Sequence, residues 1–95
     1  MNLPVPVMSL NAEQKITLVN HEALSLFDNY GKIQLGKRLY EYFPDYITGR
    51  ISVALHTHTC RKIKKCSLNE ILYNIDYIPL PNKSQKGGIL VFRQL

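Results

Sequence analysis

The alternation of apolar and polar positions divides the chain into two strands, a helical middle and three further strands. Residues 4–10 are apolar and partly β-branched, and a polar turn at residues 11–14 leads into a second apolar run at residues 15–19. Apolar, β-branched runs bounded by turn residues are typical of strands. We therefore predict strands over residues 4–10 and 15–19, joined by a tight connection.

A short helix is predicted next, over residues 21–28. Asn20 is a favourable N-cap, and Glu22 lies in the first turn, where the helix dipole favours an anion. Asn29 or Gly31 can adopt the left-handed conformation that closes a helix, so residues 29–31 are expected to end it. From their spacing, Ala23, Leu24 and Phe27 are expected to form the buried face of this helix.

The middle of the chain predicts two helical pieces separated by a proline. Residues 36–46 hold apolar and aromatic side chains at helical spacing before Pro44, which should stop that turn. Residues 47–57 carry apolar side chains along one side, the pattern of an amphipathic helix over a core. This is the longest helix predicted. The two apolar sets are Leu39, Tyr42 and Phe43, and then Ile47, Ile51, Ala54 and Leu55.

Three strands complete the prediction, over residues 60–67, 70–80 and 88–93, with a hairpin loop at residues 81–87. Two strands, then helices, then three strands indicate an α+β domain in which helices cover one face of an antiparallel sheet. With 95 residues, the chain has room for a single domain, residues 1–95.

Composition fits a soluble globular chain, with 45% hydrophobic and 20% charged residues. No stretch approaches the roughly 20 apolar residues of a membrane-spanning helix, and the first residues lack the regions of a signal peptide. We expect no membrane partner and a cytoplasmic location.

The formal charge of +5 raises the question of a nucleic-acid partner, because Arg61, Lys62, Lys64 and Lys65 supply much of the excess. Lysine and arginine along an exposed edge strand also discourage edge-to-edge aggregation. The charge run lacks interleaved stacking aromatics, which makes it weak evidence for nucleic acid. We expect no direct nucleic-acid binding.

Four possible soft metal ligands lie close together in the sequence: His56, His58, Cys60 and Cys66. Zinc accepts such donors in tetrahedral geometry, but this spacing is not that of a known finger. His56 and His58 also cannot both point inward from one regular helix. We therefore expect no metal site and read both cysteines as reduced thiols.

The parity of the strand at residues 70–80 decides which side chains face the core. Burying Asn74 and Asp76 without partners would be costly, so Tyr73, Ile75 and Tyr77 are predicted to point inward. Their phenols either orient a small ligand in an apolar cavity or simply fill that cavity. Filling is the favoured interpretation, since tyrosine is common in the cores of small domains.

Chemistry by the chain itself is not expected. The sequence contains no nucleophile elbow, phosphate loop, kinase signature or pair of acids on adjacent turns. Gly87 and Gly88 form a hairpin element rather than a phosphate cradle, because no helix start follows them. The chain is predicted not to be an enzyme.

The order and spacing of these features resemble the PAS family of sensory domains. The matching segments are the leading Pro-Val strand, the junction KITLVNHEA at residues 15–23, Leu-Gly-Lys at 35–37, the helix at 51–55, Ile-Pro-Leu at 78–80 and GGILVFR at 87–93. Many PAS domains end their last strand with an aspartate and a small polar residue, where this chain has Gln94 and Leu95.

The resemblance implies a five-stranded antiparallel sheet in the order 2-1-5-4-3, with residues 60–67 at an edge and 88–93 in the centre. The central strand is apolar on both faces at residues 89–92, although only one face can contact the helices. An uncovered apolar patch on a soluble monomer is unusual. We therefore expect a flanking helix or a second copy to cover the outer face, and predict a homodimer.

The resemblance also implies a regulatory role, as the sensory and dimerisation domain of a bacterial sensor histidine kinase or enhancer-binding transcription regulator. The domain would couple small-ligand or partner binding to an output domain of the same polypeptide. A ligand-free structural module for protein–protein interaction is the alternative, and a dry core would favour it. The candidate ligand-pocket residues are Phe27, Leu39, Phe43, Ile51, Leu55, His58, Tyr73, Ile75 and Tyr77.

Two cofactors known from the family are weighed against these residues. His58 continues the stripe of Ile51 and Leu55 and could coordinate haem, but a single imidazole without an orienting partner is weak evidence. The flavin-binding branch carries an Asn-Cys-Arg-Phe-Leu segment, where this chain has Leu-Tyr-Glu-Tyr-Phe at residues 39–43. The expected cofactor is none, with haem at His58 as the alternative.

Overall fold

The computed structural model describes residues 5–27, 32–81 and 87–95. The described residues form strands and short helical segments in the order predicted for an α+β domain. The elements are β1 (Val7–Asn11), β2 (Ile16–Val19), α1 (His21–Leu26), the 3₁₀ turn η2 (Leu39–Glu41), α2 (Asp45–Thr57), β3 (Arg61–Leu68), β4 (Ile71–Pro79) and β5 (Gly87–Gln94).

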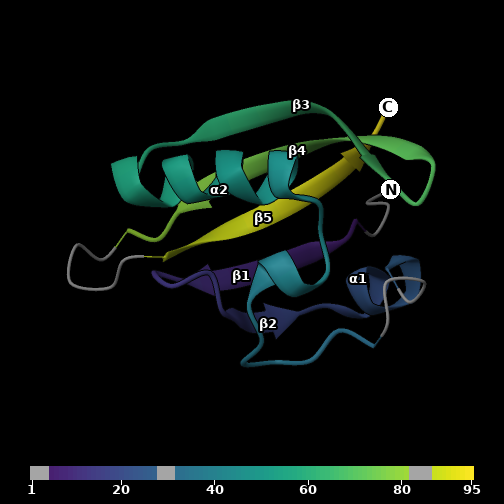
Figure 1. The fold of residues 1–95 in the computed structure, drawn as a ribbon, viewed down its shortest axis with the longest axis horizontal. Coiled ribbons are helices and arrows are strands. Elements are labelled where there is room, and N and C mark those ends of the chain that lie inside the picture. Colours follow the sequence, from purple (N-terminus) through teal and green to yellow (C-terminus); the bar gives the residue numbers. More distant parts are fainter. Residues whose placement is uncertain (1–4, 28–31, 82–86) are drawn as a thin grey trace.

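The five strands form one antiparallel sheet in the order β2-β1-β5-β4-β3 (Figure 1). The predicted sheet order is therefore confirmed, with β5 in the centre and β3 at an edge. The helical segments cover the inner face, with α2 crossing the half of the sheet that holds β3 and β4. The core lies between this layer and the sheet.

Asn20 joins the first helix to the first strand, as its role as N-cap predicted. Its Oδ1 accepts hydrogen bonds from the amides of Ala23 and Val7, each at 3.0 Å, and its Nδ2 donates to the carbonyl oxygen of Val5 at 2.8 Å. One side chain thus satisfies an open helix amide and anchors the start of β1.

Several predicted bounds move by one to three residues. Strand β1 begins at Val7 rather than residue 4, which lies outside the described residues, and Pro6 has no amide hydrogen to donate to the ladder. Helix α1 ends at Leu26, with Phe27 as its C-cap, and the predicted closure at residues 28–31 lies outside the described residues. Helix α2 begins two residues early, at Asp45, because Pro44 adopts extended N-cap geometry with φ −64°.

Most ends of the remaining strands differ from the predicted bounds by one residue. The turn between β3 and β4 explains the difference at the start of β4. Asn69 and Glu70 both have positive φ, 55° and 65°, and form a two-residue hairpin connection. Glutamate is an unusual residue for this left-handed conformation. Strand β4 therefore starts at Ile71 rather than Glu70.

Candidate functional site

The interior holds eight of the nine residues predicted to line a ligand pocket. Their side chains are at most 5% exposed and belong to one hydrophobic core, and the predicted inward parity of β4 is confirmed. The eight are Phe27, Leu39, Phe43, Ile51, Leu55, Tyr73, Ile75 and Tyr77. The structure therefore brings the predicted residues together, with His58 as the exception.

Aromatic rings pack against one another at the centre of this core. The ring of Phe27 lies 5.3 Å from that of Phe43 and 4.9 Å from that of Phe92, measured between centroids. Tyr73 completes the cluster with an edge-on contact to Phe92. Phe92 was missing from the predicted site, although its inward position follows from the period-2 alternation of β5. These aromatic side chains pack against one another in the core.

Tyr77 uses its hydroxyl for an internal bond. The phenol donates to the carbonyl oxygen of Gly87 at 3.1 Å, and the ring lies against Gly88, where a Cβ would overlap it. Burial raises the pKa of Tyr77 above its ordinary value, with the nearby Cys60 adding to the shift. Gly88 therefore leaves room for the tyrosine ring, and the carbonyl oxygen of Gly87 provides a hydrogen-bond partner for the phenol.

His58 lies just beyond the end of α2, so the helical stripe of Ile51 and Leu55 does not extend to it. The helix ends at Thr57, and His58 takes a left-handed conformation with φ 53° that turns its side chain away from the helical register. Its Nε2 lies 3.0 Å from the carbonyl oxygen of Leu80, which can only accept, so Nε2 carries the proton. The Nδ1 atom is buried with no hydrogen-bond partner among the described residues.

The predicted metal candidates are also dispersed. Cys60 is exposed, Cys66 is fully buried, and His56 is exposed on α2. Within residues 5–27, 32–81 and 87–95, no group of three or more potential ligands comes together. Burial raises the pKa of the Cys66 thiol, against a smaller opposing effect of the Arg50 charge, so this thiol stays protonated at neutral pH.

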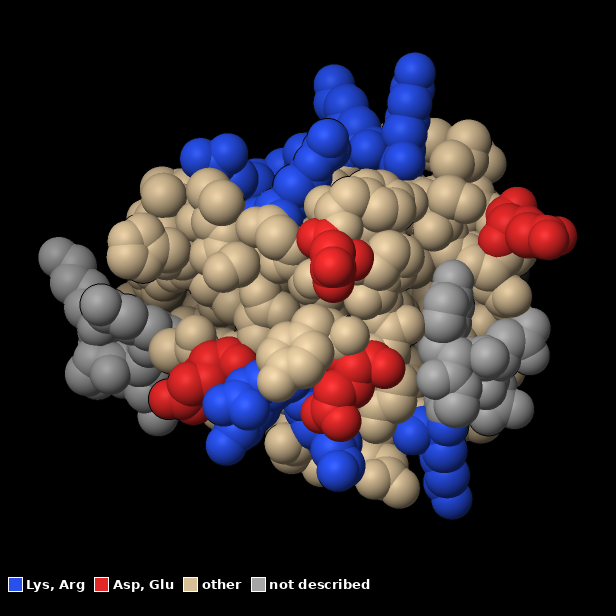
Figure 2. All heavy atoms as spheres, viewed as in Figure 1, with Lys and Arg blue, Asp and Glu red and all other residues tan. Residues whose placement is uncertain are grey.

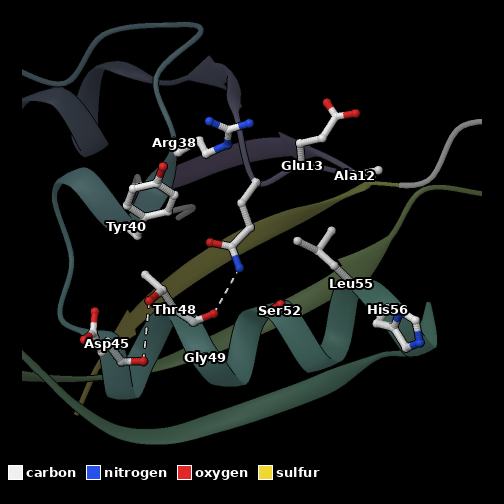
Figure 3. Close-up of a pocket in the computed structure, with 11 residues that line it drawn as sticks. Ala12, Glu13, Arg38, Tyr40, Asp45, Thr48, Gly49, Ser52, Leu55 and His56 are labelled. Atoms are coloured by element: carbon white, nitrogen blue, oxygen red, sulfur yellow. Dashed lines mark hydrogen bonds between the residues drawn. The ribbon is translucent and has the colours of Figure 1, made fainter.

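A surface groove of about 590 Å³, which the sequence did not reveal, lies between α2 and the turn that joins β1 to β2 (Figure 3). Gln14, in the left-handed conformation with φ 62°, donates from Nε2 to the carbonyl oxygen of Thr48 at 3.0 Å. Its Oε1 is buried and has no partner among the described residues. The side chains of Glu13, Arg38 and Asp45 supply both signs of charge around the groove.

The outer face of the sheet is the other distinctive surface. Across the strands, Leu18 pairs with Ser9, Ser9 with Ile89, and Ile89 with Ile78, which places these side chains in one row. Leu18 is 53% exposed and Ile78 is 44% exposed, while Ile89 is half-buried. No helix of the described residues lies against this row of three apolar side chains and Ser9, because the helices cover the opposite face.

Solved structures share this architecture. The PAS domain of the histidine kinase ThkA is 19% identical with a TM-score of 0.76, covering 96% of this chain and 99% of that one. A domain of an HTR-like protein from Haloarcula marismortui is 18% identical with a TM-score of 0.73, covering 98% and 99%. The Aer2 receptor from Vibrio cholerae, a dual PAS-haem oxygen sensor, is 15% identical with a TM-score of 0.67, covering 97% and 95%.

These similarities define the class of the domain, a small antiparallel sheet with helices packed on one face. The chain has the PAS fold. No protein-family model matches the sequence, and no curated protein matches it significantly. None of the helices in the described part of the chain is long and apolar enough to cross a membrane.

The haem alternative can be tested against the residues around His58. Haem ligation requires an imidazole nitrogen aimed at a cavity wide enough for the macrocycle. Here Nε2 lies 3.0 Å from the carbonyl oxygen of Leu80, and Nδ1 is buried without a partner among the described residues, so neither nitrogen is free to reach a macrocycle without breaking this packing. The described residues do not fit a haem group.

Proposed function

We propose that this chain is a non-enzymatic sensory and dimerisation domain of a cytoplasmic signalling protein, a sensor histidine kinase or an enhancer-binding transcription regulator. It would pass a change of packing or dimer contact to an output domain of the same polypeptide. The PAS fold, shared with a histidine-kinase domain, supports the class. The apolar outer face of the sheet is the observation that carries the dimerisation role.

The outer face is suited to a second copy of the same chain. Val7 and Val91 pair across β1 and β5 and extend the apolar row around Ile89. Beside them, the Nε of Arg93 lies 2.9 Å from the Oδ2 of Asp76, so opposite charges are paired on this face. Two copies that approach face to face would bury apolar area on both sides.

The test is the oligomeric state of two matched lysine variants. Ile89→Lys places a charge at the centre of the outer face, whereas Leu24→Lys places one on α1, where Leu24 is 40% exposed. We expect native mass spectrometry to show a dimer for the wild type and for Leu24→Lys, and a monomer for Ile89→Lys. Circular dichroism checks that both variants fold. A wild-type monomer, or a dimer that survives Ile89→Lys, would contradict the proposal.

Small-ligand binding is a second candidate function. The groove beside α2 is a better candidate for the ligand site than the packed interior. The buried Oε1 of Gln14 lacks a partner among the described residues, and such an atom is satisfied by a ligand donor or by water. The same native spectra report any retained mass. We expect Gln14→Leu to lose the ligand mass if the groove holds the ligand. A variant that keeps this mass would indicate that the ligand binds in the interior instead.

A further inference from the structure

The excess positive charge of the chain is concentrated on one surface. Arg50 on α2 and four residues of β3 are exposed and lie on the same side of the molecule, and Figure 2 shows Lys and Arg side chains gathered along the rim where Figure 1 places β3. The chain has 12 Lys and Arg residues, of which these are five. The other seven equal the seven Asp and Glu in number, so the formal net charge of +5 corresponds to this surface. We call this surface the cationic face: Arg50, Arg61, Lys62, Lys64 and Lys65.

The cationic face is not neutralised from within. The ion pair of the described residues joins Arg93 to Asp76, and none of the five cations forms one with a described residue. Asp76 is the cross-strand partner of Lys62, yet its Oδ2 is bonded to Arg93. The repulsion among clustered like charges therefore remains until an anion binds.

Protection of the sheet edge accounts for only part of this face. The register of β3 shifts between Ile63 and Cys66, and Lys65 takes φ 57° while its amide donates to the Oδ1 of Asn74 at 3.1 Å. This bulge leaves Lys64 and Lys65 exposed and already disrupts pairing with another edge. Arg50 lies on α2, where edge protection does not apply, and Arg61 and Lys62 lie on the other side of the bulge.

Arg50, Arg61 and Lys62 are among the residues that line a hollow between α2 and β3. The hollow has a volume of about 320 Å³ and combines three cations with two aliphatic side chains. Val53 is 50% exposed, so part of the apolar surface is open to a partner, whereas Ile63 is buried. The lining residues are Arg50, Val53, Arg61, Lys62 and Ile63.

We propose that this hollow docks an acidic segment of a partner protein, in which an apolar side chain lies between carboxylates. The carboxylates would pair with the cations of the rim, and the apolar side chain would cover Val53. A second copy of this chain is a poor occupant, because outside the cationic face its charges balance. A nucleic-acid backbone or an anionic bilayer would match the charge but make no use of an aliphatic contact inside a narrow hollow.

The experiment measures binding of a fluorescent peptide in which Asp and Glu flank Leu, at physiological salt. Arg61→Glu/Lys62→Glu reverses two cations of the hollow, and Lys32→Glu/Lys37→Glu makes the same change of net charge at exposed positions elsewhere. We expect the first pair to weaken binding about tenfold or more and the control pair about twofold at most, because distant charges are screened. Equal losses in both would show a diffuse charge effect and overturn the proposal.

A second variant separates the peptide from other polyanions. Val53→Ser keeps every charge and alters an exposed residue, so the fold is expected to survive. We expect it to weaken the peptide about threefold or more through lost apolar contact, and to leave binding of a single-stranded oligonucleotide of equal charge unchanged. Tighter binding to that oligonucleotide or to phosphatidylserine vesicles than to the peptide, or no peptide binding at all, would refute an acidic protein segment as the partner.

Discussion

The two faces of the sheet are built from alternate residues of the same strands, yet their side chains differ in burial. On the inner face, Tyr73, Ile75 and Phe92 are at most 2% exposed and pack into one core. On the outer face, Leu18 and Ile78 are about half exposed. The difference shows that the inner face is completed within the chain, whereas the apolar side chains of the outer face have no cover among the described residues. The same strand can thus serve stability on one side and association on the other.

The largest contrast is expected at neighbouring positions of the central strand. Phe92→Ala removes a fully buried ring from the aromatic cluster, and we expect it to lower the free energy of unfolding by about 4 kcal/mol. Val91→Ala, one residue away on the outer face, should cost about 1 kcal/mol or less in the monomer. Chemical denaturation at low protein concentration measures both. Equal losses would remove the distinction between the faces.

The inner face can be probed again at its glycine contact. Gly88→Ala places a Cβ against the ring of Tyr77, and we expect a loss of about 1 to 3 kcal/mol in the free energy of unfolding. The matched control is Gly49→Ala on α2, where a Cβ meets open space and should stabilise the helix by about 0.5 to 1 kcal/mol. Chemical denaturation measures both variants. An unchanged denaturant midpoint for Gly88→Ala would contradict this account.

The buried thiol of the inner face should make stability fall in alkaline solution. Burial raises the pKa of Cys66 above its ordinary value of 9.0, so the folded state keeps a proton that the unfolded chain releases. This contribution is fully present below pH 9.0 and is lost as the pH rises through the folded pKa. Tyr77 acts in the same direction from its ordinary value of 10.0.

Thermal unfolding across this alkaline range measures the effect. We expect Cys66→Ala to have a shallower decline of stability between pH 8 and pH 10 than the wild type, by about one proton of linkage at most. Cys60→Ala changes an exposed thiol and should alter the slope less, through its smaller contribution to the raised pKa of Tyr77. A slope unchanged by Cys66→Ala would show that this thiol does not carry the effect.

The smallest expected effect concerns the turn that joins β3 to β4, outside both faces. Glu70→Gly relieves a left-handed glutamate with φ 65°, and we expect a gain of about 1 kcal/mol in the free energy of unfolding. Its neighbour Asn69 tolerates this conformation better, so Asn69→Gly should gain less. A loss of stability in Glu70→Gly would indicate that the side chain itself holds the turn.

Much of the fold could be predicted because its signals are local. Asn20 as a cap, Pro44 as a break between helical pieces and the inward parity of Tyr77 all follow from short-range chemistry. The bulge in β3 could not be predicted, because it resets the period of two: Ile63 and Cys66 both face the core although they are three residues apart.

The candidate surfaces were harder to predict than the interior. The groove beside α2 joins Gln14, Arg38 and Thr48, which are far apart in the sequence and have no common pattern. Helical spacing places His58 in the pocket. In the structure, however, the helix ends at Thr57, and His58 itself is left-handed, so helical spacing no longer applies to it. Sequence periodicity identifies faces within one element and does not show where elements end or meet.

Association through the outer face is tested most directly by intermolecular nuclear Overhauser effects in a sample that mixes labelled and unlabelled chains. We predict intermolecular contacts at the methyl groups of Ile78, Ile89 and Val91, which lie on the outer face of β4 and β5. A dimer whose intermolecular contacts avoid these methyl groups, or a spectrum without any at high concentration, would contradict the account.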